Sequence, residues 1–237
     1  MDKEEKECYN SFHIGLEVIM ITEYKVAYYG GEFEIVEKKS RFIATVKPIE
    51  SEEDAIAFIE QLKKKNWNAT HNCYAYVLGQ KNEIQRFSDD GEPQGTAGKP
   101  ILDVLLGEEV HNVAVVVTRY FGGTLLGTGG LVRAYSKSAK AGLEHSTILT
   151  KQLGKKLLLT MDYNNVGKLQ YILAQMQIDT IDSVYKEDVL LYVVVPVDKL
   201  DTLVKKVMEA TSATATMEEL QTVYYATLDG KIITFDK

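Results

Sequence analysis

The alternation of hydrophobic and polar positions in the first half of the chain predicts a mostly β structure with two helices. Strand patterns rich in β-branched and aromatic residues cover residues 21–29, 32–37, 41–48, 73–78, 83–87 and 113–117. The last of these is apolar at every position, which is typical of a strand buried on both faces. Gly30-Gly31 separates the first two strands and predicts a hairpin.

Helical spacing occurs twice in the same half. Ser51 begins a capping box with the three acidic residues after it, and apolar residues then follow at helical spacing to about Asn66. Residues 131–145 form the second helical pattern. Residues 88–100 collect three glycines and two prolines, so they predict a long loop, and long loops in compact domains tend to be functional.

The second half has the order strand, helix, strand, strand, helix, strand. These elements are expected at residues 156–161, 166–176, 178–185, 189–195, 198–210 and 220–226. The βαββαβ order predicts a ferredoxin-like sandwich with both helices on one face of an antiparallel sheet. Asp229-Gly230 predicts a terminal hairpin.

We predict an α+β protein of two domains, residues 20–150 and 151–237, with the boundary in the polar stretch 146–156. Residues 1–19 have no sustained period and are expected to be a poorly ordered extension. Met1 and Met20 are alternative starts of the chain.

Composition excludes several protein classes. The chain has 237 residues, of which 45% are hydrophobic and 26% charged, as in a folded globular protein. The longest apolar run, 189–197, is far shorter than the roughly 18 residues that cross a bilayer, so no membrane span is expected. Cys8 and Cys73 form no CxxC pair, which argues against a disulfide framework or a zinc site and favours the cytoplasm.

Charge is unevenly distributed. The net charge is −7, and residues 1–19 hold five acidic and two basic residues. The rest of the chain is close to neutral, which disfavours a diffusely basic nucleic-acid binder but allows a local basic patch.

A glycine loop, residues 119–130, is the densest candidate for chemistry. Five of the nine residues from Gly122 to Gly130 are glycine. Such a loop before a helix lets the backbone approach an anion, and phosphate is the expected guest. The P-loop pattern fails because Thr128 stands where lysine is required, and the dinucleotide fingerprint fails at Val132. The alternative is a glycine loop that only turns the chain.

The helix after this loop has a cationic side. At 100° per residue, Arg133, Lys137 and Lys140 lie opposite Leu131 and Tyr135. A cationic stripe beside a helix amino end predicts contact with the phosphates of RNA or DNA, and the alternative is a solvated helix face. The predicted anion-binding residues are Arg119, Gly122, Gly123, Gly127, Thr128, Gly129, Arg133, Lys137 and Lys140.

A second, acidic loop is a further candidate. Its candidate residues are Asp89, Asp90, Glu92, Thr96 and Gly98. The spacing matches no calcium loop, so turn-forming acids are favoured over a metal site, and no cofactor is predicted. His71 and Cys73 could form a nucleophile pair on one strand face, but a packed histidine and a small buried thiol are favoured.

Four stretches carry a family resemblance. They are residues 39–44 (KSRFIA), 71–76 (HNCYAY), 89–98 (DDGEPQGTAG) and 119–127 (RYFGGTLLG). Together they closely resemble the YigZ/IMPACT family over about residues 20–145, and residues 151–237 look like the smaller second domain of its bacterial members.

The resemblance implies a first domain with the α/β fold of the second domain of small-subunit ribosomal protein five. It also implies a ferredoxin-like second domain similar to one in elongation factor G. Both of those relatives touch ribosomal RNA. In eukaryotic members the shared domain belongs to a translational regulator that binds the ribosome-bound activator of a starvation-sensing kinase, and bacterial members are expected to associate with nucleic acid or the ribosome.

The favoured interpretation is a cytoplasmic protein that binds RNA, the ribosome or a translation-related protein and adjusts translation. Catalysis is left open, with a non-enzymatic role favoured. One alternative is an enzyme acting on a small phosphorylated or carboxylated substrate between the acidic and glycine loops. Another is a protein-binding adaptor.

Overall fold

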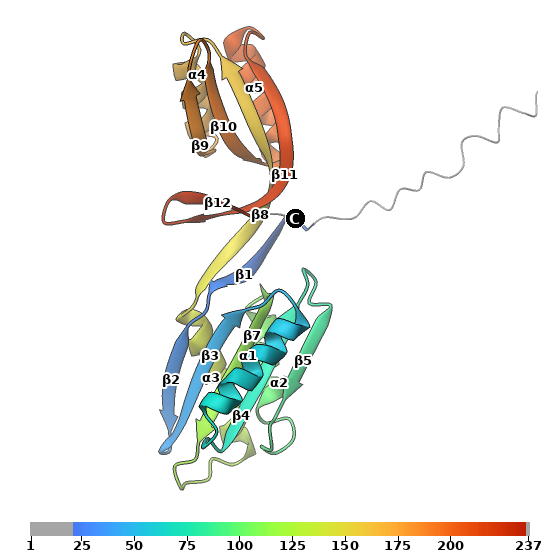
Figure 1. Cartoon of the computed structure of the whole chain (residues 1–237), viewed down its shortest axis with the longest axis vertical. Coiled ribbons are helices and arrows are strands. Elements are labelled where there is room, and N and C mark those ends of the chain that lie inside the picture. The colour runs from blue at the N-terminus through green and yellow to red at the C-terminus, as the bar shows by residue number, and fades with distance from the viewer. Residues whose placement is uncertain (1–20, 236–237) are drawn as a thin grey trace, which may run out of the picture.

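The computed structural model describes residues 21–235, which form two α+β units along one long axis (Figure 1). The extension and the two candidate start positions lie outside these residues. The strands are β1 (Glu23–Tyr29), β2 (Glu32–Glu37), β3 (Ser40–Pro48), β4 (His71–Leu78), β5 (Ile84–Ser88), β6 (Val110–His111), β7 (Val113–Tyr120), β8 (Thr147–Met161), β9 (Thr180–Tyr185), β10 (Val189–Pro196), β11 (Thr216–Leu228) and β12 (Lys231–Phe235). The helices are α1 (Glu52–Lys65), α2 (Gly98–Gly107), α3 (Thr128–Glu144), α4 (Val166–Gln175) and α5 (Leu200–Thr211), with a short 3₁₀ turn at Val197–Lys199.

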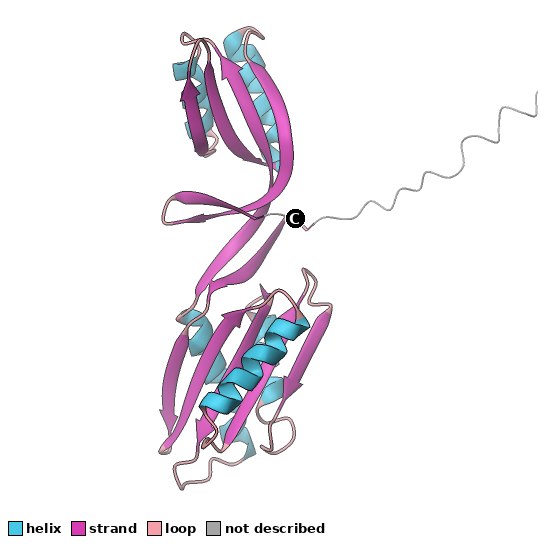
Figure 2. Cartoon of the chain, viewed as in Figure 1, coloured by secondary structure: helices cyan, strands magenta, loops and turns pink. Residues whose placement is uncertain are grey.

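The first unit is built on a five-stranded antiparallel sheet in the order β2-β3-β7-β4-β5. Helix α1 covers one face, and α2 and α3 cover the other (Figure 2). Central strand β7 is buried on both sides, as predicted: Val116 packs in the cluster with α1, and Val115 and Val117 pack in the cluster with α2 and α3. The capping box is also confirmed, because Ser51 Oγ accepts the Asp54 N–H at 3.1 Å.

The predicted hairpin at Gly30-Gly31 is wrong. β1 pairs with β8 and β6, whereas β2 pairs with β3, so the two glycines carry the chain from one sheet to the other. The crossing is tight: a Cβ on Gly30 would lie 2.0 Å from the Val46 carbonyl oxygen. A Cβ on Gly31 would lie 2.2 Å from that of His145. The glycines are therefore required by close backbone approach, not by a turn between paired strands.

Helix α2 was not predicted from the sequence. The loop that starts after β5 ends at Gly98, where α2 begins, and Pro100 lies in the first turn of this helix. Proline is tolerated there because the first N–H groups of a helix have no partner within it. Gly98 is buried, and a Cβ there would lie 2.7 Å from the backbone of Ser88, so α2 packs directly on the end of β5.

The second unit has the predicted ferredoxin-like topology. Its strands lie in the antiparallel order β11-β8-β10-β9, and α4 and α5 pack in one cluster against this sheet. The predicted hairpin at Asp229-Gly230 is confirmed as the β11–β12 connection. None of the helices within residues 21–235 is long and apolar enough to cross a membrane.

The predicted boundary near residue 150 falls inside β8, a continuous strand of 15 residues. The first part of β8 pairs with β1, and the rest pairs with β10 and β11. A Cβ on its Gly154 would lie 2.8 Å from side-chain atoms of Val194 and Tyr225, so this glycine lets the sheet pack closely. In Figure 1 the strand runs from one unit into the other.

Candidate functional site

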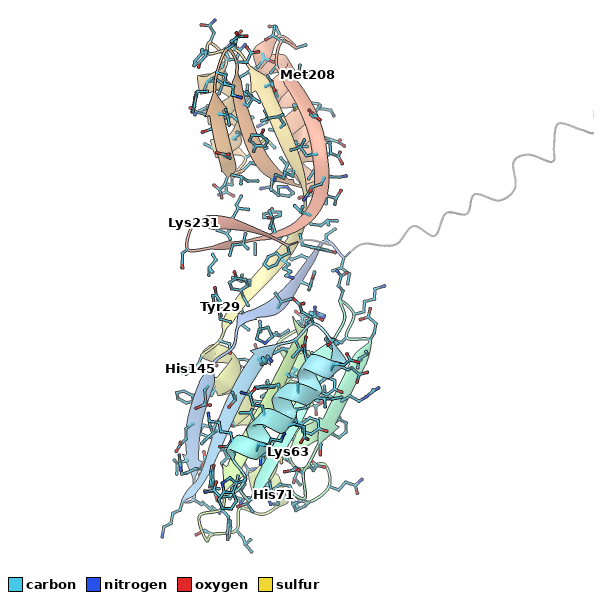
Figure 3. The ribbon with its side chains drawn as sticks, in the orientation of Figure 1. Tyr29, Lys63, His71, His145, Met208 and Lys231 are labelled. Atoms are coloured by element: carbon cyan, nitrogen blue, oxygen red, sulfur yellow. The ribbon has the colours of Figure 1, made fainter. Side chains whose placement is uncertain are left out.

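A pocket of about 430 Å³ lies between the acidic loop and the glycine loop. We call it the loop pocket. Figure 3 labels His71 at this end of the first unit, which is the end farthest from the second unit. The lining residues come from both loops, from the start of β4 and from the start of α3: Thr70, His71, Gly91, Glu92, Pro93, Arg119, Phe121, Leu125, Leu126, Gly127, Thr128 and Leu131.

A buried ion pair lies at the loop pocket. Arg119 Nη1 is 2.5 Å from Glu92 Oε1, and the two residues are 5% and 8% exposed. Arg119 continues the face of β7 that carries Val115 and Val117, so strand alternation directs it towards the core beneath α3. The rings of Phe42 and Phe121 lie 5.3 and 5.6 Å from its guanidinium carbon.

Tyr135 and Cys73 extend this network inward. The Tyr135 hydroxyl donates to Glu92 Oε1 at 2.7 Å, and the Cys73 thiol lies 3.3 Å from the same hydroxyl and 2.9 Å from the Asp89 carbonyl oxygen. Burial raises the pKa of the Cys73 thiol, and burial together with Cys73 and Glu92 raises the pKa of the Tyr135 hydroxyl. Both groups are therefore neutral hydrogen-bonding groups at neutral pH, and the predicted buried thiol is confirmed.

His71 lies at the edge of the loop pocket. Its Nδ1 is 2.8 Å from the Asp90 carbonyl oxygen, and its Nε2 is 3.8 Å from Glu92 Oε2. The side chain forms no hydrogen bond with Cys73 among those of the described residues, so the nucleophile pair considered from the sequence is not assembled. His71 instead connects the start of β4 with the acidic loop.

The acidic loop is organised by its own carboxylates. Asp89 accepts the backbone N–H groups of Gly95, Ala97 and Gly98 at 2.8–3.0 Å, and so caps the start of α2. Asp90 accepts the N–H of Asn72 at 2.6 Å.

Thr96 of this loop has a structural role too. Thr96 donates from its hydroxyl to the Pro93 carbonyl. Within residues 21–235 no group of three or more histidine, cysteine or acidic side chains is placed to hold a metal ion. The turn-forming interpretation of these acids fits the contacts that they make.

The glycine loop brings backbone N–H groups to the rim of the loop pocket. The N-cap of α3 is Gly127, with φ 74° and ψ 165°, a region that is essentially restricted to glycine. In the part of the chain that the structure describes, no side chain caps this helix start. A Cβ on Gly122 would lie 2.0 Å from the backbone of Lys39, so the loop packs against the turn between β2 and β3.

The cationic side of α3 is exposed, as predicted, and two of its residues have acidic partners. Lys137 Nζ is 2.9 Å from Glu37 Oε1, and Lys140 Nζ is 3.0 Å from Glu108 Oε1. Arg133, Lys137 and Lys38 line a second hollow, of about 250 Å³, which shares Leu126 with the loop pocket.

We call Lys38, Lys39, Arg133 and Lys137 the basic face. Sequence reasoning missed the two lysines of the β2–β3 turn. Their place beside the glycine loop follows from the packing of Gly122 on Lys39, and this contact has no counterpart in the sequence pattern.

Arg119 was expected in the anion-binding set as the residue that braces the site. Its charge is paired with a buried carboxylate that lies 27 residues away in the chain. Arg119 therefore holds the acidic loop to β7 rather than presenting a free charge. Lys140 is also set apart, because its partner Glu108 follows α2 and lies outside the hollow that Arg133 and Lys137 line.

Comparison with known proteins identifies two family matches. The Impact N-terminal domain matches residues 38–143, and a domain of unknown function, DUF1949, matches residues 159–214. The chain is 44% identical over 170 residues to the IMPACT family member YvyE of Bacillus subtilis, covering 72% of this chain and 78% of the relative. It is 41% identical over 165 residues to the IMPACT family member YigZ of Escherichia coli, covering 69% and 81%.

One similar solved structure, the crystal structure of a hypothetical protein, is 32% identical to this chain. The alignment covers 85% of this chain and 99% of that one, with a TM-score of 0.54. The similarity to that structure therefore includes both units of this chain.

Proposed function

Because this chain belongs to the IMPACT family, we propose that it regulates translation by binding structured RNA through the basic face. The observation that carries the proposal is the placement of three exposed cations, Lys38, Arg133 and Lys137, around one hollow beside the glycine loop. The fourth, Lys39, is the exposed neighbour of Lys38 in the β2–β3 turn, and its backbone packs against Gly122 of the glycine loop. Four cations from two elements can meet successive phosphates of one backbone.

The ion pair between Lys137 and Glu37 does not oppose this role. The Lys137 side chain is 65% exposed, and surface ion pairs of this kind contribute little free energy. An RNA phosphate can therefore compete with Glu37 for Lys137. The nearly neutral body of the chain fits a local interface better than binding over the whole surface.

The test is fluorescence anisotropy with a labelled RNA hairpin at several salt concentrations between 50 and 200 mM. We expect the triple variant K38E/R133E/K137E to bind much more weakly than the unmodified protein. The slope of log K against log salt should fall in magnitude by about 2 to 3, because each phosphate contact contributes about 0.7–0.9.

The matched control is K64E/K205E/K231E, which makes the same change of charge at three exposed lysines outside the basic face. It should keep most of the affinity and slope of the unmodified protein, apart from the effect of net charge. Equal losses in the two triple variants, or no RNA binding by the unmodified protein at 50 mM salt, would reject the basic face as the interface. Capture of a protein partner that survives nuclease treatment would then favour the adaptor.

A further inference from the structure

The start of α3 offers unpaired N–H groups to the loop pocket. The first turn of a helix has no internal acceptors for its N–H groups, and here no side chain supplies one. The N–H groups of Thr128, Gly129 and Gly130 precede the first helical bond, from Leu131 N to the Gly127 carbonyl. Gly127 and Thr128 both line the pocket, so the positive end of the helix lies at its wall.

A second, independent feature points to a ligand in the same pocket. Glu92 is 8% exposed, and only its Oε1 has hydrogen-bond partners among the described residues, namely Arg119 and Tyr135. Oε2 has none and faces His71 Nε2 at 3.8 Å. Arg119 is 5% exposed, and its Nε is a buried donor that has no partner within residues 21–235. Buried polar groups normally have hydrogen-bond partners, and Glu92 lines the loop pocket, so its Oε2 is open to a donor from a molecule bound there.

The hydrogen bond at His71 Nδ1 indicates which kind of chemical group the loop pocket would accept. A carbonyl oxygen only accepts, so the contact between Nδ1 and the Asp90 carbonyl places a proton on Nδ1. In the neutral ring Nε2 is then an acceptor that faces the Glu92 carboxylate oxygen. With the ring neutral, these two acceptors 3.8 Å apart suit a molecule that donates to both of them, such as one with neighbouring hydroxyl groups, whereas a protonated ring would itself pair with Glu92.

The remaining wall of the pocket is apolar. Phe121 and Leu125 are 46% and 81% exposed at its mouth, and Leu131 lies deeper. A volume of about 430 Å³ is within the range of small-molecule sites, which are mostly apolar with a few convergent polar groups.

From these features we propose that the loop pocket binds a small polyhydroxylated molecule that carries a phosphate group. The phosphate binds the N–H groups at the start of α3, and the hydroxyl groups donate to Glu92 Oε2 and His71 Nε2. The carbon skeleton lies against Phe121 and Leu131. This site is distinct from the basic face, since of the cations in that face none lines the loop pocket.

The test is isothermal titration calorimetry of the full chain with glycerol 3-phosphate, inorganic phosphate and glycerol at millimolar concentrations. Glycerol 3-phosphate presents both a phosphate and neighbouring hydroxyls, so it should bind at least about tenfold more tightly than either fragment, given the strength of hydrogen bonds to charged groups. Equal affinity for glycerol 3-phosphate and inorganic phosphate would overturn the proposal, and so would the absence of measurable binding of glycerol 3-phosphate.

Variants of Glu92 or Arg119 risk unfolding, so the decisive substitution is at the helix start. Thr128→Glu places a carboxylate in the first turn of α3, where it favours the helix but repels a phosphate. It should weaken glycerol 3-phosphate binding at least about tenfold, which is the effect of a lost charged contact.

The matched control is Thr124→Glu, the same change at an exposed residue of the glycine loop that does not line the pocket. It should bind within about twofold of the unmodified protein, since exposed charges are screened by salt. Equal weakening in both variants would reject the placement of the phosphate at α3. K38E/K137E should keep glycerol 3-phosphate binding, and its loss in that variant would assign the phosphate to the basic face instead.

Discussion

Glu92 and Arg119 are 27 residues apart in the chain, yet they form an ion pair that is almost completely buried beneath α3. The pair joins the acidic loop to the central strand of the first sheet. The acidic loop therefore depends on the core of the first unit for its position.

The first prediction concerns the free energy of unfolding of variants in this pair. Arg119→Met should cost about 3–5 kcal/mol, because it leaves the Glu92 carboxylate buried without its cation. The double variant R119M/E92Q should be more stable than R119M by at least about 1 kcal/mol, since the neutral amide needs no counter-charge. Urea denaturation of both variants measures this, and strictly additive losses would contradict it.

The buried thiol predicts an alkaline loss of stability. Burial raises the pKa of Cys73 in the folded protein, whereas in the unfolded chain the thiol loses its proton above about pH 8.5. The unfolded state therefore binds fewer protons above that pH, and the free energy of unfolding should fall by about 1.4 kcal/mol per pH unit.

The measurement is a series of urea denaturations between pH 7.5 and 9.8, in a Cys8→Ser background so that one thiol remains. A second substitution, Cys73→Ala, should flatten this part of the profile whatever it does to stability at pH 7.5. Parallel profiles with and without Cys73 would exclude the thiol as the cause.

Two glycines of the glycine loop should respond differently to alanine. Gly127 has a backbone conformation that alanine rarely adopts, so Gly127→Ala should cost about 1–3 kcal/mol although its Cβ would meet open space. Gly129 is in the first turn of α3, and a Cβ there would make only an ordinary contact with Arg133. Gly129→Ala should therefore keep stability or gain up to about 1 kcal/mol. Thermal denaturation compares the two, and the reverse ranking would contradict the loop geometry.

Asp89 should determine the order of the acidic loop. Asp89→Ala removes the acceptor of three backbone N–H groups and should cost about 2 kcal/mol. Hydrogen exchange should become faster at Ala97 and Gly98.

Asp103→Ala is the control for this prediction, because among the described residues Asp103 makes only an exposed ion pair with Lys99 on α2. It should change stability by less than about 1 kcal/mol. Unchanged exchange at the start of α2 in Asp89→Ala would show that the cap is dispensable.

Much of the fold could be predicted because its elements have strong local signals. The apolar run in β7, the helical stripe of α3 and the cap at Ser51 each depend on a short stretch of sequence. Helix α2 was missed because a glycine and a proline in its first turn resemble loop residues. The bend at Gly30-Gly31 was misread because a tight turn and a tight crossing both require glycine.

The site was less predictable, for a different reason. Arg119 was expected beside an anion at the glycine loop, whereas arginine is rarely buried without a partner within the protein. The alternation of Val115, Val117 and Arg119 along β7 was a signal for an inward direction, but Glu92 lies far away in the sequence. The inward direction of Arg119 could therefore be predicted from its place in the strand. Its pairing with Glu92 could not, because only the fold brings the two residues together.

The uninterrupted β8 strand also limits how this chain can be divided. β1 pairs with its residues 147–152, and β10 pairs with residues 154–161. Cutting the backbone between these groups would leave β1 paired with one piece of β8 and β10 paired with the other, but it would separate Gln152 from its β11 partner Tyr225 and end the continuity of the strand that both units share. A rotation of one unit relative to the other must therefore twist β8 itself, because a continuous strand connects the two units instead of a flexible linker.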